Sequence, residues 1–107
     1  MSLNEINVKQ LKSMFDKDVN FILLDVRTEN EVIISKISKS IHIPMNDIAN
    51  RFTELDKSTE IIVYCKSGKR SSKVCEFLIN NQFNNIKNLS GGIVAWSKEI
   101  DPTIIVY

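Results

Sequence analysis

Two short, uninterrupted apolar runs limit the folds open to this chain more than any other feature. Residues 21–26 read FILLDV, and residues 61–64 read IIVY. A strand with one face in water alternates apolar and polar side chains, whereas a strand covered by helices on both faces is apolar almost throughout. Shorter runs at 41–43 and 86–89 predict two further strands. The pattern predicts an α/β fold with a mostly parallel central sheet flanked by helices on both faces.

Helical periodicity fills the segments between these runs. Apolar residues recur at helical spacing over 8–15, after a candidate cap at Asn7, and again over 48–55. The clearest predicted helix runs from 71 to about 81, and a last short one covers 93–98. With 107 residues, 43% of them apolar, the chain can bury one core. We therefore expect residues 1–107 to form a single domain.

Charge and composition exclude several classes of protein. The 14 basic and 13 acidic side chains nearly cancel, so no overall field favours nucleic acid or an anionic membrane as partner. The chain shows neither an apolar stretch of about 18 residues nor a secretory leader, so we expect a cytoplasmic protein. One histidine and two cysteines without a C-x-x-C spacing do not make a structural zinc site, and we expect neither metal nor cofactor.

The segment 65–71 is the candidate active site, because it lies where a buried strand ends and a helix is predicted to begin. Several backbone N–H groups and the positive end of the helix converge in such a place. They favour the thiolate of a cysteine there, as do nearby cations, and no histidine base is needed. We expect Cys65 to be the nucleophile. The expected substrate-binding residues are Lys66, Ser67, Gly68, Lys69 and Ser71.

Each cysteine also has a structural interpretation. Cys65 as a core residue beside a solvated basic loop is the commoner situation for a cytosolic cysteine. The coincidence of strand end, glycine, cations and helix start favours a reactive thiol instead. Cys75 shares a helical stripe with Val74 and Leu78, so we expect it in the core. The alternative for Cys75 is a thiol that resolves oxidised Cys65.

Three sequence blocks, in this order, resemble those of the rhodanese-homology family. They are LLDVRTENE at 23–31, CKSGKRS at 65–71 and LSGGIVAW at 89–96. The resemblance covers nearly the whole chain and implies a rhodanese-like fold. It implies an enzyme, a thiosulfate-type sulfurtransferase, in which Cys65 accepts a sulfane sulfur from a small anionic donor as a persulfide. The sulfur then passes to a thiophilic acceptor.

The resemblance also assigns roles to other residues. Arg70 would order the loop or contact the donor. Asp25 and Arg27 would support the site, an ordinary ion pair being the alternative. The chain departs from the family at residues 35–40, where many members have two glycines and a histidine. Lys36 could there replace the histidine as partner of Glu31, and we expect His42 to be structural.

The C-terminal segment 93–107 is similar to the end of rhodanese domains fused behind adenylyltransferases that serve sulfur-carrier proteins. If the similarity holds, the chain is part of a longer protein, and its partner is a sulfur-carrier protein or a protein that donates a persulfide. The alternative is a free-standing domain whose tail packs on the sheet.

Two other functions compete with sulfur transfer. A phosphatase or arsenate reductase uses a cysteine and an arginine in a similar loop, but with five intervening residues. The four between Cys65 and Arg70 make a tighter curl, which suits one sulfur atom better than a phosphoryl group. A non-catalytic interaction module is the second alternative, and the presence of Cys65, Gly68 and Arg70 disfavours it.

Overall fold

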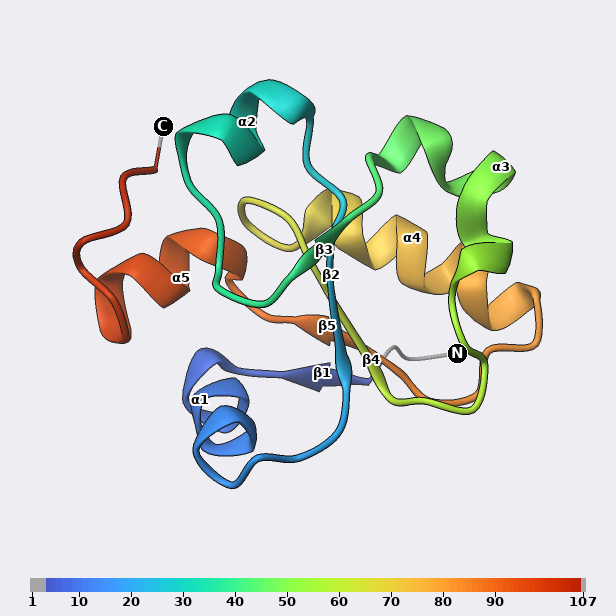
Figure 1. The fold of residues 1–107 in the computed structure, drawn as a ribbon, viewed down its shortest axis with the longest axis horizontal. Helices are drawn as coiled ribbons and strands as arrows, with labels where there is room; N and C mark the ends of the chain where they lie inside the picture. The colour runs from blue at the N-terminus through green and yellow to red at the C-terminus, as the bar shows by residue number, and fades with distance from the viewer. Residues whose placement is uncertain (1–3, 107) are drawn as a thin grey trace.

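The computed structural model describes residues 4–106, in which strands and helices alternate along the chain (Figure 1). In chain order the elements are β1 (Glu5–Ile6), α1 (Val8–Asp16), β2 (Ile22–Asp25), α2 (Glu29–Ile34), β3 (Ile41–His42), the 3-10 turn η1 (Met45–Asp47), α3 (Ile48–Arg51), the 3-10 turn η2 (Phe52–Glu54), β4 (Ile61–Tyr64), α4 (Lys69–Asn80), β5 (Ile86–Leu89) and α5 (Gly92–Glu99). Within residues 4–106, no helix is long and apolar enough to cross a membrane.

The five strands lie parallel in one sheet, in the order β1-β5-β4-β2-β3. The predicted α/β fold with a mostly parallel sheet is therefore confirmed. The predicted strands at 61–64 and 86–89 have the expected bounds. β1 has no counterpart in the sequence prediction, because a two-residue strand is too short to show an apolar pattern.

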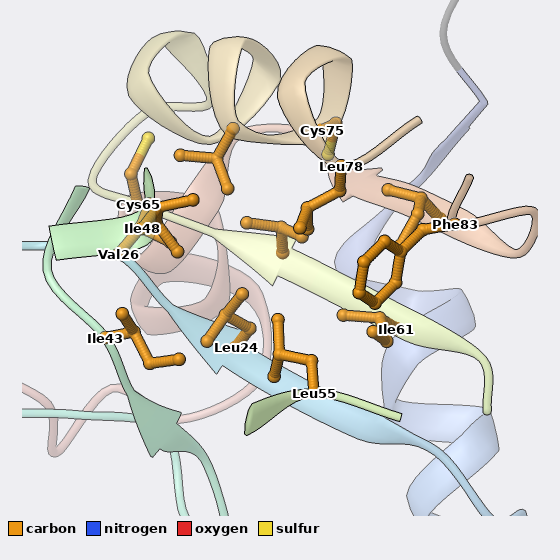
Figure 2. Close-up of a cluster of buried hydrophobic side chains, with 13 residues drawn as sticks. Leu24, Val26, Ile43, Ile48, Leu55, Ile61, Cys65, Cys75, Leu78 and Phe83 are labelled. Atoms are coloured by element: carbon orange, nitrogen blue, oxygen red, sulfur yellow. The ribbon is translucent and has the colours of Figure 1, made fainter. Parts of the chain in front are cut away.

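Helices cover both faces of the sheet, as its apolar strands require (Figure 1). Ile61 and Val63 of β4 pack in a core with α3 and α4, whereas Ile62 and Tyr64 pack in a second core with α1 and α5. Figure 2 shows the first core, in which the Cys65 side chain points toward α4. The Cys65 side chain therefore lies on the face of the sheet that α4 covers.

The helix α2 has no apolar pattern that would predict it. None of its residues is buried, and Ile33 is 81% exposed. Its start is encoded by a capping box: the Glu31 N–H donates to the Thr28 hydroxyl oxygen, and the Glu31 carboxylate accepts from the Thr28 N–H. Polar residues therefore place this helix, and with it the carboxylate of Glu31.

The carboxyl ends of β2, β4 and β5 meet at one edge of the sheet. The register aligns Asp25 with Tyr64, and Asn88 with Val63. Because the strands are parallel, the segments that follow them emerge side by side at this edge, where α/β proteins bind ligands. The candidate site lies among these segments.

Candidate active site

The loop after β4 makes one tight curl before α4 begins. α4 starts at Lys69, two residues before the predicted Ser71, because the curl is complete at Gly68. Gly68 has a φ of 111°, in a region where other residues are strained. Its carbonyl accepts a helical hydrogen bond from the Ser72 N–H at 3.1 Å. Gly68 therefore turns the chain into the helix three residues after Cys65.

The Cys65 sulfur receives hydrogen bonds from this curl. The Gly68 N–H donates to it at 3.1 Å, and the Ser71 hydroxyl lies 3.3 Å away. Cys65 is only 1% exposed, and burial by itself raises the pKa of the thiol. Hydrogen bonds from Ser71, Gly68 and Ser67 outweigh this effect and lower the pKa overall. The curl therefore favours a thiolate, the reactive form of cysteine.

The carbonyl groups of the curl are bound by α5. The N–H groups of Ile93 and Val94, in the first turn of α5, donate to the carbonyls of Cys65 and Lys66 at 3.0 and 3.1 Å. The close approach of α5 to the curl requires a glycine at position 92, because a Cβ on Gly92 would lie 2.5 Å from the Cys65 carbonyl oxygen. This anchor fixes the peptide groups at the start of the curl and so helps to orient the N–H groups that follow.

Arg70 pairs with Glu31 and so connects α4 to α2. Two hydrogen bonds, at 2.7 and 2.9 Å, join the guanidinium to both carboxylate oxygens. The bonds from Arg70, reinforced by those from Thr28, lower the pKa of Glu31 to about 2. The predicted pair of Lys36 with Glu31 does not form: Arg70 binds this carboxylate, and Lys36 is exposed.

Replacing Glu31 with glutamine should destabilise the protein by about 1 kcal/mol near neutral pH, because it removes a partly exposed, bidentate ion pair. Glutamine still completes the capping box, so the substitution removes the negative charge of Glu31 but keeps the cap of α2. Folding lowers the pKa of Glu31 from 4.5 to about 2, so the ionised carboxylate stabilises the fold at pH values above 4.5. This contribution is lost as the pH falls toward 2.

Urea unfolding of the wild type and of Glu31→Gln, from neutral to acidic pH, measures this effect. The difference in unfolding free energy should shrink steadily below the ordinary pKa of 4.5. Glu54→Gln is the control, because Glu54 makes an exposed pair with Arg51 and should matter less. A difference between Glu31→Gln and wild type that is independent of pH would contradict the assigned ion pair.

Asp25 and Arg27 form a buried ion pair at the end of β2. The Arg27 guanidinium, in a residue only 3% exposed, donates to Asp25 at 2.8 Å and to the Ser35 carbonyl at 2.6 Å. His42 Nε2 lies 2.6 Å from the Arg27 carbonyl oxygen. The pair lies at the same sheet edge as Cys65, but no hydrogen bond within residues 4–106 joins the two. Its contacts hold the segments on both sides of α2 together.

The lysines around the curl are partly or fully exposed. Lys69 and Lys73 are exposed, Lys66 is half-buried, and none of the three makes an ion pair within residues 4–106. Ser67, between two of them, is also exposed. The surface beside Cys65 therefore carries positive charge that forms no ion pair with the acidic side chains of the described residues.

Cys75 lies in the core beneath α4, as predicted. It is fully buried with Val74 and Leu78 in the core shown in Figure 2. Burial, followed by the nearby Cys65, raises the pKa of the Cys75 thiol to about 12. Both cysteines are free thiols. Burial therefore favours the thiol of Cys75 over the reactive thiolate.

Asn88 belongs to this site, although the motifs of the sequence do not single it out. It is 1% exposed; its Oδ1 accepts from the Ser71 hydroxyl at 2.5 Å, and its Nδ2 donates to the Gly68 carbonyl at 3.2 Å. The sequence does contain a feature that could have identified Asn88, because it is an amide side chain inside the buried strand β5. A buried amide needs hydrogen-bonding partners, and the strand's carboxyl end leads to the same edge as Cys65.

The fold and the site define an α/β protein that holds a cysteine in a curl of backbone N–H groups. The family of rhodanese-like domains matches residues 7–99. The chain is 37% identical to the protein YtwF of Bacillus subtilis, over 95% of the chain and 98% of that protein. It is 31% identical to a sulfurtransferase of Allochromatium vinosum, over 95% of each. The chain belongs to the rhodanese-like family, and sulfurtransferases are among its full-length relatives.

A solved structure and a longer relative extend these comparisons. A rhodanese-like domain protein from Staphylococcus aureus has the same fold, with a TM-score of 0.85 and 30% identity over 92% of this chain and 95% of that one. The adenylyltransferase and sulfurtransferase MOCS3-2 of Zea mays is 29% identical over 95% of this chain but 23% of its own length. The similarity to that protein is thus confined to one part of it.

Proposed function

We propose that this protein is a thiosulfate-type sulfurtransferase that carries a sulfane sulfur on Cys65 as a persulfide. The observation that carries the proposal is the hydrogen bonding of the Cys65 sulfur by the Gly68 N–H and the Ser71 hydroxyl. These groups stabilise negative charge on the thiolate, and we expect N–H groups of residues 66–71 to stabilise the terminal sulfur of a persulfide in the same way. We therefore expect covalent transfer in two half-reactions.

In the first half-reaction, the Cys65 thiolate attacks the outer sulfur of thiosulfate. A sulfur–sulfur bond forms, the bond to the sulfonate sulfur breaks, and sulfite leaves with the electron pair. In the second, a thiophilic nucleophile such as cyanide attacks the terminal sulfur of the persulfide. The bond between the two persulfide sulfurs breaks, thiocyanate leaves, and the thiolate is restored. Each half-reaction conserves charge and needs no external oxidant.

Other residues of the site contribute by holding this loop in place. Arg70, fixed by its two bonds to Glu31, orders the first turn of α4 and adds positive charge near the sulfur. Asp25 and Arg27 support the site indirectly, because they hold the segments that flank α2. Within this proposal, the nucleophile is Cys65, and the charged groups around it position the loop and the donor.

Steady-state transfer from thiosulfate to cyanide tests the proposal. Double-reciprocal plots at several cyanide concentrations should be parallel, because a persulfide enzyme completes the first half-reaction before the second begins. The same preparation should not hydrolyse p-nitrophenyl phosphate. Phosphate ester hydrolysis without sulfur transfer would favour the phosphatase alternative, and the absence of both activities would favour the interaction module.

The uncompensated lysines beside Cys65 support an acidic partner, either a sulfur-carrier protein or a protein that donates a persulfide. The adenylyltransferase and sulfurtransferase of Zea mays contains a region similar to this chain, which is consistent with a protein partner in sulfur transfer. Positive charge at the mouth of a site accelerates association with an acidic surface, and it attracts a small anion such as thiosulfate in the same way.

Replacing Lys66 and Lys69 with glutamine should weaken the use of thiosulfate by about threefold to tenfold in kcat/KM at low ionic strength, with little loss at high ionic strength. Both side chains act through screened attraction, so salt removes their advantage. Lys9→Gln with Lys17→Gln is the matched control, because both lysines are exposed around α1, on the other face of the sheet. Equal kcat/KM for wild type and loop variant at low salt would show that the lysines do not steer the donor.

A further inference from the structure

The hydroxyl of Ser71 lies between two hydrogen-bond acceptors. Its oxygen is 3.3 Å from the Cys65 sulfur and 2.5 Å from the Asn88 side-chain oxygen. A hydroxyl has one proton to donate and an oxygen that can accept. A thiol can donate its own proton to the Ser71 oxygen, which leaves the hydroxyl proton for Asn88. A thiolate or persulfide anion can only accept, and it then competes with Asn88 for that proton.

The neighbours of Asn88 fix which way its amide points. The Nδ2 group donates to the Gly68 carbonyl oxygen at 3.2 Å and to a Glu5 carboxylate oxygen at 3.0 Å, both of which only accept. Rotating the amide by half a turn would place its oxygen against these two acceptors. The Asn88 oxygen therefore faces Ser71 and draws the hydroxyl proton away from the sulfur.

We infer that Asn88 is a positioning residue for the Cys65 sulfur, because its side-chain oxygen competes with the sulfur for the single proton of the Ser71 hydroxyl. In the thiol form, the chain from Cys65 through Ser71 to Asn88 is fully hydrogen-bonded. When the sulfur becomes charged, the hydroxyl turns to it at the expense of the bond to Asn88. Asn88 thus limits how strongly Ser71 stabilises the charged sulfur.

Only the catalytic consequence of this inference rests on the proposed function. The competition of Asn88 and the Cys65 thiolate for the Ser71 proton does not depend on sulfur transfer. The ionisable groups around the site are Cys75 of α4, Glu5 of β1, the Asp25–Arg27 and Glu31–Arg70 pairs, and the lysines of the curl and of α4, Lys66, Lys69 and Lys73. The variants used to test the inference keep all of these groups, although Asn88→Leu removes the hydrogen bond from Nδ2 to Glu5. The effect of Asn88→Leu in the Ser71→Ala background measures any change in the titration of Cys65 that does not act through the Ser71 hydroxyl.

A double-mutant cycle of Ser71→Ala and Asn88→Leu tests the competition. The readout is the rate at which iodoacetamide modifies the Cys65 peptide, followed by mass spectrometry as a function of pH. Ser71→Ala should raise the apparent pKa of Cys65 by about one unit, because a bond to the charged form is lost. Asn88→Leu should lower it by about half a unit, because the hydroxyl is freed for the sulfur. In the Ser71→Ala background, Asn88→Leu should have no effect.

Two results would overturn the inference. One is a shift caused by Asn88→Leu that is the same with and without the Ser71 hydroxyl, since Asn88 would then act through Gly68 or the fold. The other is a rise in the pKa of Cys65 in Asn88→Leu. Ser71→Thr keeps the hydroxyl and should titrate like wild type, and Asn88→Ala replaces Asn88→Leu in the cycle if the latter does not fold. Because alkylation needs no sulfur donor, its outcome is independent of whether the chain transfers sulfur.

Discussion

Cys65→Ser should abolish sulfur transfer from thiosulfate to cyanide, lowering kcat/KM by roughly a thousandfold or more. A serine hydroxyl in the same curl cannot form a persulfide, even though the Gly68 N–H that contacts the sulfur is retained. The fold should survive, because the substitution is nearly isosteric and the new hydroxyl keeps the hydrogen-bonding neighbours of the thiol. The measurement is the steady-state rate of thiocyanate formation.

Cys75→Ser is the matched control for this prediction. Cys75 is fully buried, and its raised pKa keeps it a thiol at neutral pH. The substitution should cost stability, because it buries a hydroxyl in an apolar core, but it should retain most of the activity of the folded protein. Equal loss of transfer in Cys65→Ser and Cys75→Ser would indicate a mechanism that uses both cysteines.

Gly92→Ala should destabilise the protein by roughly 2–4 kcal/mol, the largest loss expected from adding one methyl group near the site. Gly92 has a φ of 57°, and an added Cβ would lie 2.5 Å from the Cys65 carbonyl oxygen. The curl can avoid this contact only by moving away from α5, which breaks the bonds from Ile93 and Val94. The folded fraction should lose about 100-fold in kcat/KM, because the sulfur moves relative to its donors.

Gly68→Ala separates backbone strain from the close contact. Gly68 also has a positive φ, but its added Cβ would be no closer than 3.7 Å to its neighbours. Gly68→Ala should therefore lower the free energy of unfolding by less than Gly92→Ala does, by the about 1 kcal/mol that backbone strain alone costs. Thermal unfolding and transfer assays of the two variants compare these effects. A larger loss in Gly68→Ala would contradict the role assigned to the contact between α5 and the curl.

Much of the fold could be predicted because its central strands are apolar on both faces. The run IIVY gave the bounds of β4 correctly, since every one of its side chains is buried. The helix expected over 48–55 is instead the short helix α3 followed by the 3-10 turn η2. Apolar spacing alone does not distinguish these, because 3-10 turns also bring residues three apart to one side. α2 was not predicted for the opposite reason: none of its residues is fully buried, so it has no apolar stripe.

The site was predictable where its chemistry is local in sequence. The curl from Cys65 to Gly68 and the following helix are contiguous, so a strand end, a glycine and a helical pattern suffice to place them. Contacts between distant segments were not predictable in this way. The pairing of Glu31 with Arg70 depends on where the exposed helix α2 lies, and the contact of Asn88 with Ser71 depends on the order of β4 and β5 in the sheet.

The central claim is that Cys65 carries the transferred sulfur, and the mass of the intact protein tests it most directly. After incubation with thiosulfate and removal of excess donor, the wild type should gain the mass of one sulfur atom, located by peptide mapping on Cys65. Cyanide should remove this mass and release thiocyanate, and Cys65→Ser should gain nothing. An unchanged mass in the wild type, or sulfur bound at Cys75 instead, would contradict the proposed mechanism.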